Sequence, residues 1–326
     1  MRTPGFWYGT PDTASRLIAR SLAPFGALYG LAGRLRMAAA TPYRADIPVV
    51  CVGNLVAGGA GKTPVALALL EALKARGIAA HALTRGHGGT ERGPLRVDPA
   101  RHGPVEVGDE ALLLAAAAPC WVARDRAAGA RAAAAQGAPA LVMDDGFQNP
   151  GLAKDLSLIV VDGAAGFGNG LLIPAGPLRE PVAWGLARAD AMVVVGEDRT
   201  GVAGLAGSLP VLHARLEPDG AGDLAGRPVL AFAGIGRPEK FFATLEAAGA
   251  RIVERAAFAD HHPYRAGEIA RLLERAGDLG ALPVTTAKDA VRLDLEARAR
   301  VRVLPVRAVW RNTGALDALL DRLMVL

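Results

Sequence analysis

The segment Gly53–Pro64 carries the strongest chemical signal in the sequence, because its composition is that of a loop that binds nucleotide phosphates. It reads Gly-Asn-Leu-Val-Ala-Gly-Gly-Ala-Gly-Lys-Thr-Pro, between a strand-like run and a helix-like run. Glycines let backbone N–H groups converge on phosphate oxygens, Lys62 supplies a positive charge for the β- and γ-phosphates, and the Thr63 hydroxyl is a ligand for Mg²⁺. The contacts predicted for ATP are Val56, Ala57, Gly58, Gly59, Ala60, Gly61, Lys62 and Thr63. Because Val56 stands where the usual pattern has its first glycine, a plain glycine-rich turn is the alternative.

Two consecutive aspartates are the second chemical signal. Asp144 and Asp145 directly follow the apolar run Ala140–Met143. A carboxylate at the end of a buried strand can orient Mg²⁺ or its water shell. We therefore predict that this pair lies at the metal site, and an ordinary Asp-Gly turn is the alternative.

Two further polar clusters are weaker signals. Asp109 and Glu110 precede an apolar helical run, and Asp260, His261 and His262 are consecutive in the second half of the chain. Carboxylates at a helix start are typical of a turn, and paired histidines are typical of a protein surface. Zinc is not expected, because three consecutive side chains cannot all face one ion, and neither Cys51 nor Cys120 has a neighbour at ligand spacing.

Apolar strand-like runs alternate with helical stretches after Pro48, which predicts an α/β fold with parallel strands and right-handed crossovers. The expected strands of the first part are Val49–Val52, Ala79–Thr84, Cys120–Ala123, Leu141–Met143, Leu158–Val161 and Met192–Val195. After a loose stretch at 196–226, the expected elements are strands 229–232, 251–256, 284–286 and 301–306 and helices 239–248, 266–276 and 287–297. We thus expect a P-loop NTPase-like domain at 46–205 and a smaller α/β domain at 206–326, whose last helix packs on either domain.

The N-terminal region, residues 1–45, holds all of the net positive charge. It has six arginines against Asp12, whereas the remaining lysines and arginines balance the remaining acidic residues at 31 each. An amphipathic helix is expected, with Leu17, Phe25 and Leu28 on its apolar face, Arg16, Arg20 and Arg34 opposite, and a kink or break at Pro24. The longest uncharged stretch of this region, Ser21–Gly33, has 13 residues and is too short to span a bilayer. Contact with an anionic membrane surface and docking on the protein's own domain are the two interpretations.

The composition excludes several classes of protein. A chain of 326 residues with 51% hydrophobic and 21% charged residues is neither a disordered chain, a coiled coil nor a disulfide scaffold. Two cysteines in apolar runs fit a reducing, cytosolic setting. Because the body of the chain has balanced charge and no basic stripe with aromatic residues, a nucleic-acid partner is not expected. No obligate protein partner is evident from the sequence either.

Taken together, these motifs resemble the tetraacyldisaccharide 4′-kinase family, the lipid A 4′-kinases of Gram-negative bacteria. The resemblance runs along nearly the whole chain. Its motifs are Gly53–Pro64, Thr84–Gly86, Gly108–Glu110, Asp144–Gln148, Gly168–Pro181, Gly234–Pro238 with Phe241 and Phe242, Asp260–His262 and Thr286–Arg292. Departures are Asn149 and His87, where the family commonly has His and Tyr, and Ala287, where it has Glu.

The resemblance implies ATP-dependent phosphorylation of the 4′-hydroxyl of a tetraacylated glucosamine disaccharide 1-phosphate. It places the protein at the cytoplasmic face of the bacterial inner membrane, with ATP and Mg²⁺ as cofactors and the acylated disaccharide lipid and an anionic membrane surface as partners. The residue roles that it implies are as follows: Asp109 and His261 as base and partner, acting with Lys62; Thr63, Glu110, Asp144 and Asp145 around the metal; and Arg126, Gln148 and Asn149 toward the acceptor.

A function from another class is an ATP-operated membrane switch, a P-loop ATPase whose amphipathic helix docks on the membrane when ATP is bound. Such switches usually carry an additional lysine early in the P-loop, and Asn54–Gly59 has none. The segment Leu172–Pro181 also has no evident use in a switch. Formation of a phosphorylated lipid, rather than of ADP and phosphate alone, distinguishes the kinase from the switch.

Overall fold

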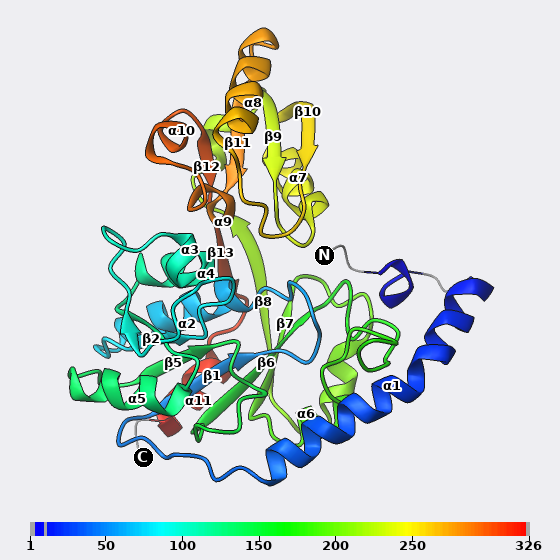
Figure 1. Ribbon diagram of the computed structural model, residues 1–326, viewed down its shortest axis with the longest axis vertical. Helices are drawn as coiled ribbons and strands as arrows, with labels where there is room; N and C mark the ends of the chain where they lie inside the picture. Colours follow the sequence, from blue (N-terminus) through cyan, green and yellow to red (C-terminus); the bar gives the residue numbers. More distant parts are fainter. Residues whose placement is uncertain (1–3, 10–11, 324–326) are drawn as a thin grey trace.

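The computed structural model describes residues 4–9 and 12–323, which fold into two α/β units, each built on its own sheet (Figure 1). The larger sheet has nine strands in the order β13-β8-β7-β6-β1-β5-β2-β4-β3. All neighbouring pairs are parallel except β13 with β8 and β3 with β4. Its strands are β1 (Val49–Gly53), β2 (His81–Thr84), β3 (Leu95–Arg96), β4 (Cys120–Val122), β5 (Leu141–Asp144), β6 (Leu156–Asp162), β7 (Ala191–Val195), β8 (Val211–Pro218) and β13 (Val306–Trp310).

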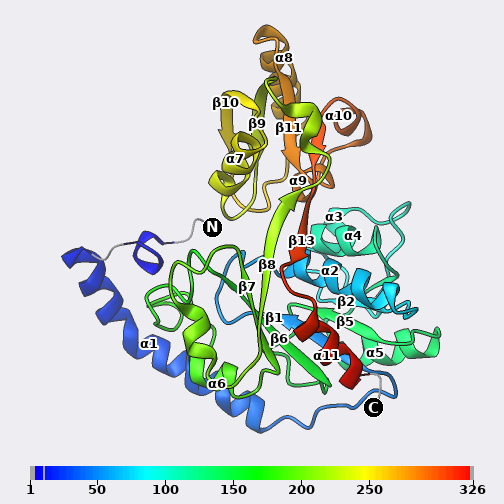
Figure 2. The same cartoon turned by 180° about the vertical axis from the view of Figure 1, so that it is seen from behind.

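The central strands of the large sheet are buried on both faces because other elements, mostly helices, pack against them, as expected for a parallel sheet. The helices α2 and α11 lie side by side, joined by ion pairs from Arg76 to Asp317 and Asp321, and α11 crosses in front of the strands in Figure 2. The helices of this unit are α2 (Lys62–Ala75), α3 (Pro104–Val107), α4 (Asp109–Ala115), α5 (Arg126–Ala135), α6 (Val182–Leu186) and α11 (Gly314–Leu323).

The smaller unit stands on one edge of the larger one and has a four-stranded parallel sheet in the order β10-β9-β11-β12 (Figures 1 and 2). Separate apolar clusters fill the two faces of this sheet, one around Phe242 and the other around Phe232. Its elements are β9 (Pro228–Ala233), α7 (Pro238–Ala247), β10 (Arg251–Ala257), α8 (Ala266–Asp278), β11 (Leu282–Thr286), α9 (Ala287–Ala290), α10 (Leu295–Ala299) and β12 (Arg302–Leu304).

The boundary between the two units differs from the domain boundary predicted at residue 206. The expected second domain at 206–326 begins before β8, yet β8, β13 and α11 all belong to the large unit. β8 and β13 pair as an antiparallel hairpin in which Pro218 lies opposite Val306. We therefore propose that the second domain is the segment between these two strands, residues 219–305.

Several expected elements differ from those observed. The strand at 211–218 falls in the stretch predicted to be loose, because only two of its eight residues are buried and it lacks a continuous apolar run. The expected strand 301–306 is two strands in different sheets, which separate at Pro305, a residue with no N–H to donate to a ladder. The expected helix 287–297 is likewise two short helices, since Asp294 caps a new start through its bond from Ala297 N.

The N-terminal helix α1 (Thr13–Ala38) is continuous, so the break predicted at Pro24 does not occur. It begins where the Asp12 carboxylate accepts a hydrogen bond from Ser15 N at 2.7 Å. Gly26 and Gly30 are buried against Leu172, while Leu17, Phe25 and Leu28 are 60–65% exposed. The helix thus lies on the large unit through its small residues and leaves its apolar face uncovered.

None of the helices within residues 4–9 and 12–323 combines the length and the apolar character that crossing a membrane requires.

The glycine contact of α1 gives a test of how the helix is held. A Cβ atom at Gly26 would lie 3.0 Å from the Leu172 carbonyl oxygen, whereas a Cβ at Gly33 would meet nothing within 4 Å. Gly26→Val should therefore push α1 away from the body, at a cost of about 1–3 kcal/mol. Hydrogen exchange should show faster exchange of α1 amides in this variant and not in Gly33→Val, which changes helix propensity equally. Equal protection in both variants would contradict this packing.

Candidate functional site

One large cavity of about 1590 Å³ runs between the two units and reaches α1. Its wall includes Gly59 from the loop before α2, Lys62 at the start of α2, Asp144 at the end of β5, His261 from the smaller unit, and Arg34 on α1. Most of the residues predicted for nucleotide, metal and acceptor binding thus share one space, whereas Val56, Ala57 and Asp109 do not line it. This is the carboxyl edge of the parallel strands, where ligands bind in open α/β sheets.

The loop at 54–61 connects β1 to α2 as predicted, and it explains why Val56 is tolerated. Positive φ angles occur at Gly58 (116°) and Gly61 (88°), and not at Val56. Val56 is instead buried and forms an isolated bridge with Leu178, next to a hydrogen bond from Ala57 N to Pro177 O of 2.8 Å. Glycine is therefore needed at the two positions with a left-handed backbone and is dispensable at the first position of the usual pattern.

Asp144 and Thr63 meet because β1 and β5 are adjacent parallel strands. Thr63 Oγ1 donates to Asp144 Oδ2 at 2.9 Å. The Asp144 side chain is buried, and its Oδ1 atom has no hydrogen-bond partner. Burial and then the charge of Glu110 raise the pKa of Asp144 to about 7. A buried carboxylate oxygen without a partner, beside a threonine hydroxyl, is a fitting pair of ligands for Mg²⁺.

Asp145 lies beside Asp144 but has cationic partners. Arg179 Nη1 contacts its Oδ1 at 2.7 Å, and Lys62 Nζ lies 3.8 Å from the same oxygen. Although burial alone would raise the pKa of Asp145, the charges of Lys62 and Arg179 lower it. Within the described residues, no three His, Cys, Asp or Glu side chains converge closely enough to hold a metal ion by themselves. Mg²⁺ in kinase sites usually takes one or two carboxylates and completes its shell with phosphates and water, so the donor set fits.

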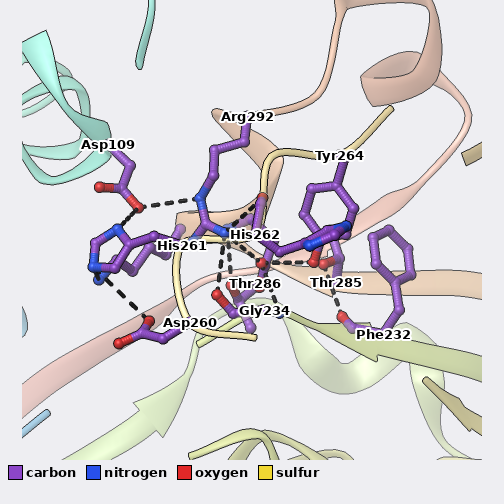
Figure 3. A network of polar contacts seen from close by, with 12 residues as sticks. Asp109, Phe232, Gly234, Asp260, His261, His262, Tyr264, Thr285, Thr286 and Arg292 are labelled. Carbon is purple, nitrogen blue, oxygen red and sulfur yellow. Dashed lines mark hydrogen bonds and ion pairs between the residues drawn. The ribbon is translucent and has the colours of Figure 1, made fainter. Parts of the chain in front are cut away.

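Asp109 meets His261 and Arg292 across the boundary between the units (Figure 3). Its Oδ2 atom lies 3.1 Å from His261 Nδ1 and 3.1 Å from Arg292 Nε, while Oδ1 contacts only Glu110 N, at 3.2 Å. Burial would raise the pKa of Asp109, but the hydrogen bond from His261 and nearby cationic charge lower it to about 2. The carboxylate is therefore ionised at neutral pH. Asp109 itself is buried behind the cavity wall, which its neighbours Glu110 and His261 line.

Glu110 follows Asp109 on α4 but faces a different partner. Its Oε1 atom accepts from Lys288 Nζ at 3.0 Å, an ion pair between the two units. The same ammonium group lies 3.2 Å from His261 Nε2. Glu110 lines the cavity close enough to influence Asp144, and its role at the metal stays a prediction.

The three residues predicted to face the acceptor all line the cavity. Arg126 is buried, donates to Ala123 O and leaves its Nε without a partner. Gln148 bridges Asn54 O (2.8 Å) and Glu180 Oε1 (3.0 Å), so its amide fixes the start of the phosphate loop. Asn149 uses its Oδ1 to accept from Gly151 N at 3.0 Å, which closes a turn in its own loop.

Sequence reasoning assigned no role to several charged residues at the cavity. They are Arg179 on Asp145, Lys288 and Arg292 around His261, and a third ion cluster in which Arg237 and Lys240 of the smaller unit meet the buried Asp162 at the end of β6. A signal for Asp162 was present, because it follows an apolar strand just as Asp144 does. Lys288 and Arg292 gave no such signal, because α9 ends at Ala290 and Arg292 lies in the turn after it.

Comparison with known proteins supports one family. The sequence profile of the LpxK family, described as tetraacyldisaccharide-1-P 4′-kinase, matches residues 18–325. A tetraacyldisaccharide 4′-kinase of Rhodospirillum centenum is 63% identical, covering 99% of this chain and 97% of its own, and one from Rhodospirillum rubrum is 56% identical, covering 100% and 98%. The crystal structure of LpxK from Aquifex aeolicus in complex with ATP is similar, with a TM-score of 0.76 and 25% identity over 94% of this chain and 99% of that one.

The raised pKa of Asp144 predicts a gain in stability on its removal. An unfolded aspartate has a pKa near 3.9, so between about pH 4 and pH 7 the folded protein binds more protons, and its stability falls as the pH rises. Asp144→Asn removes this charge and should raise the free energy of unfolding by a few kcal/mol at pH 8, by less at pH 5, and hardly at all near pH 3, below both pKa values.

Thermal unfolding without nucleotide or metal measures this effect, and Asp278→Asn, at an exposed position of α8, is the matched control. A D144N variant that is less stable than the wild type at pH 8 would show that the carboxylate stabilises the fold.

Proposed function

The chain belongs to the LpxK family of tetraacyldisaccharide-1-P 4′-kinases, and on that premise we propose how its own residues perform the reaction. The activity is ATP-dependent phosphorylation of the 4′-hydroxyl in lipid A biosynthesis. In our proposal the tetraacylated glucosamine disaccharide 1-phosphate enters the cavity from the side of α1, and ATP lies on the loop at 56–63. The observation that carries it is the shared cavity, whose wall includes both the phosphate loop and the helix with the exposed apolar face.

The phosphate loop supplies charge and position to the transferred group. Lys62 lies beside the carboxylate of Asp145 and reaches the cavity from the first turn of α2, where the helix N-terminus also favours anions. Thr63 and Asp144 would hold Mg²⁺, which when bound neutralises charge on the β- and γ-phosphates. Preorganised donors of this kind stabilise the charge that develops in the transition state.

Asp109 is the proposed base for the 4′-hydroxyl. Its Oδ2 is engaged by His261 and Arg292, which fixes the plane of the carboxylate and leaves Oδ1 toward the acceptor. A carboxylate of low pKa is a weak base, but phosphoryl transfer passes through a loose transition state in which positioning of the hydroxyl contributes more than its deprotonation. The geometry of Asp109 therefore matters more than its proton affinity.

Arg126, Gln148 and Asn149 are proposed to contact the acceptor. Arg126 offers an unpartnered Nε inside the cavity, so an anionic or hydroxyl group of the lipid would satisfy it. Because the Asn149 side chain is neutral and its oxygen closes a local turn, we assign it a role in shaping the loop rather than in proton transfer.

The proposed location is the cytoplasmic face of the inner membrane, with α1 lying on an anionic surface. The exposed side chains of α1 include Phe25 (60%), Leu28 (65%) and Leu35 (60%), and its arginines stay at the surface. Arg34 lies over the ring of Trp184 at 4.8 Å, so an exposed aromatic residue of α6 lies next to the arginines of α1. Apolar side chains and cations together are what binds an interfacial helix to anionic lipid.

The base assignment predicts how two single variants and their double variant behave. Asp109→Asn and His261→Ala should each lower kcat by roughly 10²–10⁴-fold and change ATP affinity little, because neither residue contacts the phosphate loop. The double variant should be scarcely worse than the worse single one, since both act on one hydroxyl.

The measurement is formation of the bisphosphorylated lipid from ATP and the tetraacyl disaccharide 1-phosphate, with Asp278→Asn as the control. Multiplicative losses in the double variant, or rescue of Asp109→Asn by more Mg²⁺ or by Mn²⁺, would move Asp109 to the metal.

The membrane assignment predicts salt-dependent binding to lipid. Attraction of about 1 kcal/mol per basic residue should add to apolar burial, so changing Arg16, Arg20 and Arg34 to Glu, or deleting residues 1–40, should reduce sedimentation with anionic vesicles. The matched control changes Arg271, Arg298 and Arg300, which are exposed on the smaller unit, to Glu. Unchanged binding of the α1 variants would leave α1 as a packing element.

A further inference from the structure

In the motif at 286–292, which packs directly against the proposed base, Arg292 contacts Asp109, but Lys288 has no role in the reaction as described so far. The motif forms the end of β11 and the single-turn helix α9, whose contacts with α4 join the two units. Asp289 is fully buried, and its carboxylate accepts hydrogen bonds from Gly234 N (2.8 Å) and from the hydroxyl of Tyr264 (2.8 Å). The motif is therefore anchored to the residue that follows β9 and to the loop that contains His261.

The same motif holds the backbone of His261. Arg292 Nη1 donates to Gly234 O at 3.1 Å and to His262 O at 3.3 Å, and His261 N donates to Gly234 O at 3.1 Å. His261 has a φ of 57°, a left-handed conformation that a residue with a side chain adopts at a cost. These contacts around it keep the imidazole directed at Asp109, as Figure 3 shows.

The two ring nitrogens of His261 face groups of opposite character. Nδ1 lies 3.1 Å from the Asp109 carboxylate, which can only accept a hydrogen bond when ionised. Nε2 lies 3.2 Å from the Lys288 ammonium, which can only donate one. A neutral imidazole carries one N–H, and the partner of one nitrogen decides where it sits.

We propose that Lys288 is a positioning residue that holds His261 in the neutral tautomer with hydrogen on Nδ1, and so directs one N–H at Asp109. This inference rests on the proposed function of Asp109 as the base. In this tautomer Nε2 has a lone pair for the ammonium, and Oδ2 of Asp109 receives a fixed hydrogen bond. His261 then orients the base and does not itself receive the proton of the 4′-hydroxyl.

Asp260 is the competitor that makes the role of Lys288 testable. Its Oδ1 atom is buried, has no hydrogen-bond partner among residues 4–9 and 12–323, and lies 3.9 Å from His261 Nε2. Without the ammonium group, this carboxylate would be the nearest polar partner of Nε2 and would favour hydrogen on that nitrogen. The lone pair of Nδ1 would then face Asp109, and the hydrogen bond between the dyad residues would be lost. His87, the other ring near His261, meets it edge to face at 5.5 Å.

Nitrogen NMR of the ligand-free protein reads the tautomer directly. The chain has six histidines, so a sample with ¹⁵N-labelled imidazoles gives few signals, and comparison with His261→Gln assigns those of His261. At pH 8 the wild type should show hydrogen on Nδ1 and none on Nε2. Hydrogen on Nε2 in the wild type would overturn the proposal without any variant being needed.

Two variants then test the lysine. Lys288→Met keeps the length of the side chain and removes the donor, so hydrogen should appear on Nε2, and kcat should fall by roughly 10- to 100-fold while the KM for ATP changes less than about twofold. Lys288→Arg keeps a donor and should retain the Nδ1–H tautomer. Lys74→Met, at an exposed position of α2, is the matched control.

The outcomes separate this inference from the base assignment. A Lys288→Met variant that stays folded by circular dichroism and keeps the wild-type tautomer would overturn the role of Lys288. Wild-type turnover by Asp109→Asn would instead overturn the base assignment, while the tautomer of the ligand-free wild type would still decide whether Lys288 sets the state of His261.

Discussion

The buried carboxylate of Asp109 is the constraint on which the arrangement of the two units depends. Its side chain is 3% exposed, and an ionised carboxylate at that depth is costly unless cations or donors compensate it. The large unit supplies one backbone N–H, and the remaining partners, His261 and Arg292, come from the smaller unit. The smaller unit therefore cannot move away from α4 without leaving a charge uncompensated. The contact that we propose for the chemistry thus also fixes where the second sheet stands.

A second buried carboxylate, that of Asp144 in the cavity wall, is compensated less completely. Asp109 has a lowered pKa because His261 and nearby cations outweigh the effect of burial, whereas Asp144 has a raised pKa because burial and the charge of Glu110 outweigh Lys62 and Thr63. Two buried aspartates thus have pKa values shifted in opposite directions. Asp109 is complete before any ligand arrives, while Asp144 lacks the positive charge that a metal ion would bring.

Local sequence was sufficient for the parts of the site that are continuous in the chain. The phosphate loop and the Asp144–Asp145 pair could be predicted because each follows an apolar strand, and parallel strands end at the same edge. The ion pairs could not be predicted in this way. Arg292 lies 183 residues from Asp109, and no pattern near either residue indicates the other. The strand β8 was not predicted because it is only partly buried and has no continuous apolar run. Resemblance to a family pointed to Asp109 and His261, whereas the structure was needed to find Lys288 between His261 and Glu110.

The pairing of β8 with β13 shows how the smaller unit is joined to the large sheet. Because Pro218 lies opposite Val306, the whole smaller unit occupies the place of a hairpin turn in the large sheet. A short turn at this point would close the nine-stranded sheet and leave the phosphate loop, Thr63 and Asp144 in place. Such an ancestor would hold a nucleotide but lack every partner of Asp109 other than a backbone amide. The capacity to act on a sugar hydroxyl would then have arrived as an insertion into a nucleotide-binding fold, at a position where the insertion broke no pairing of the sheet.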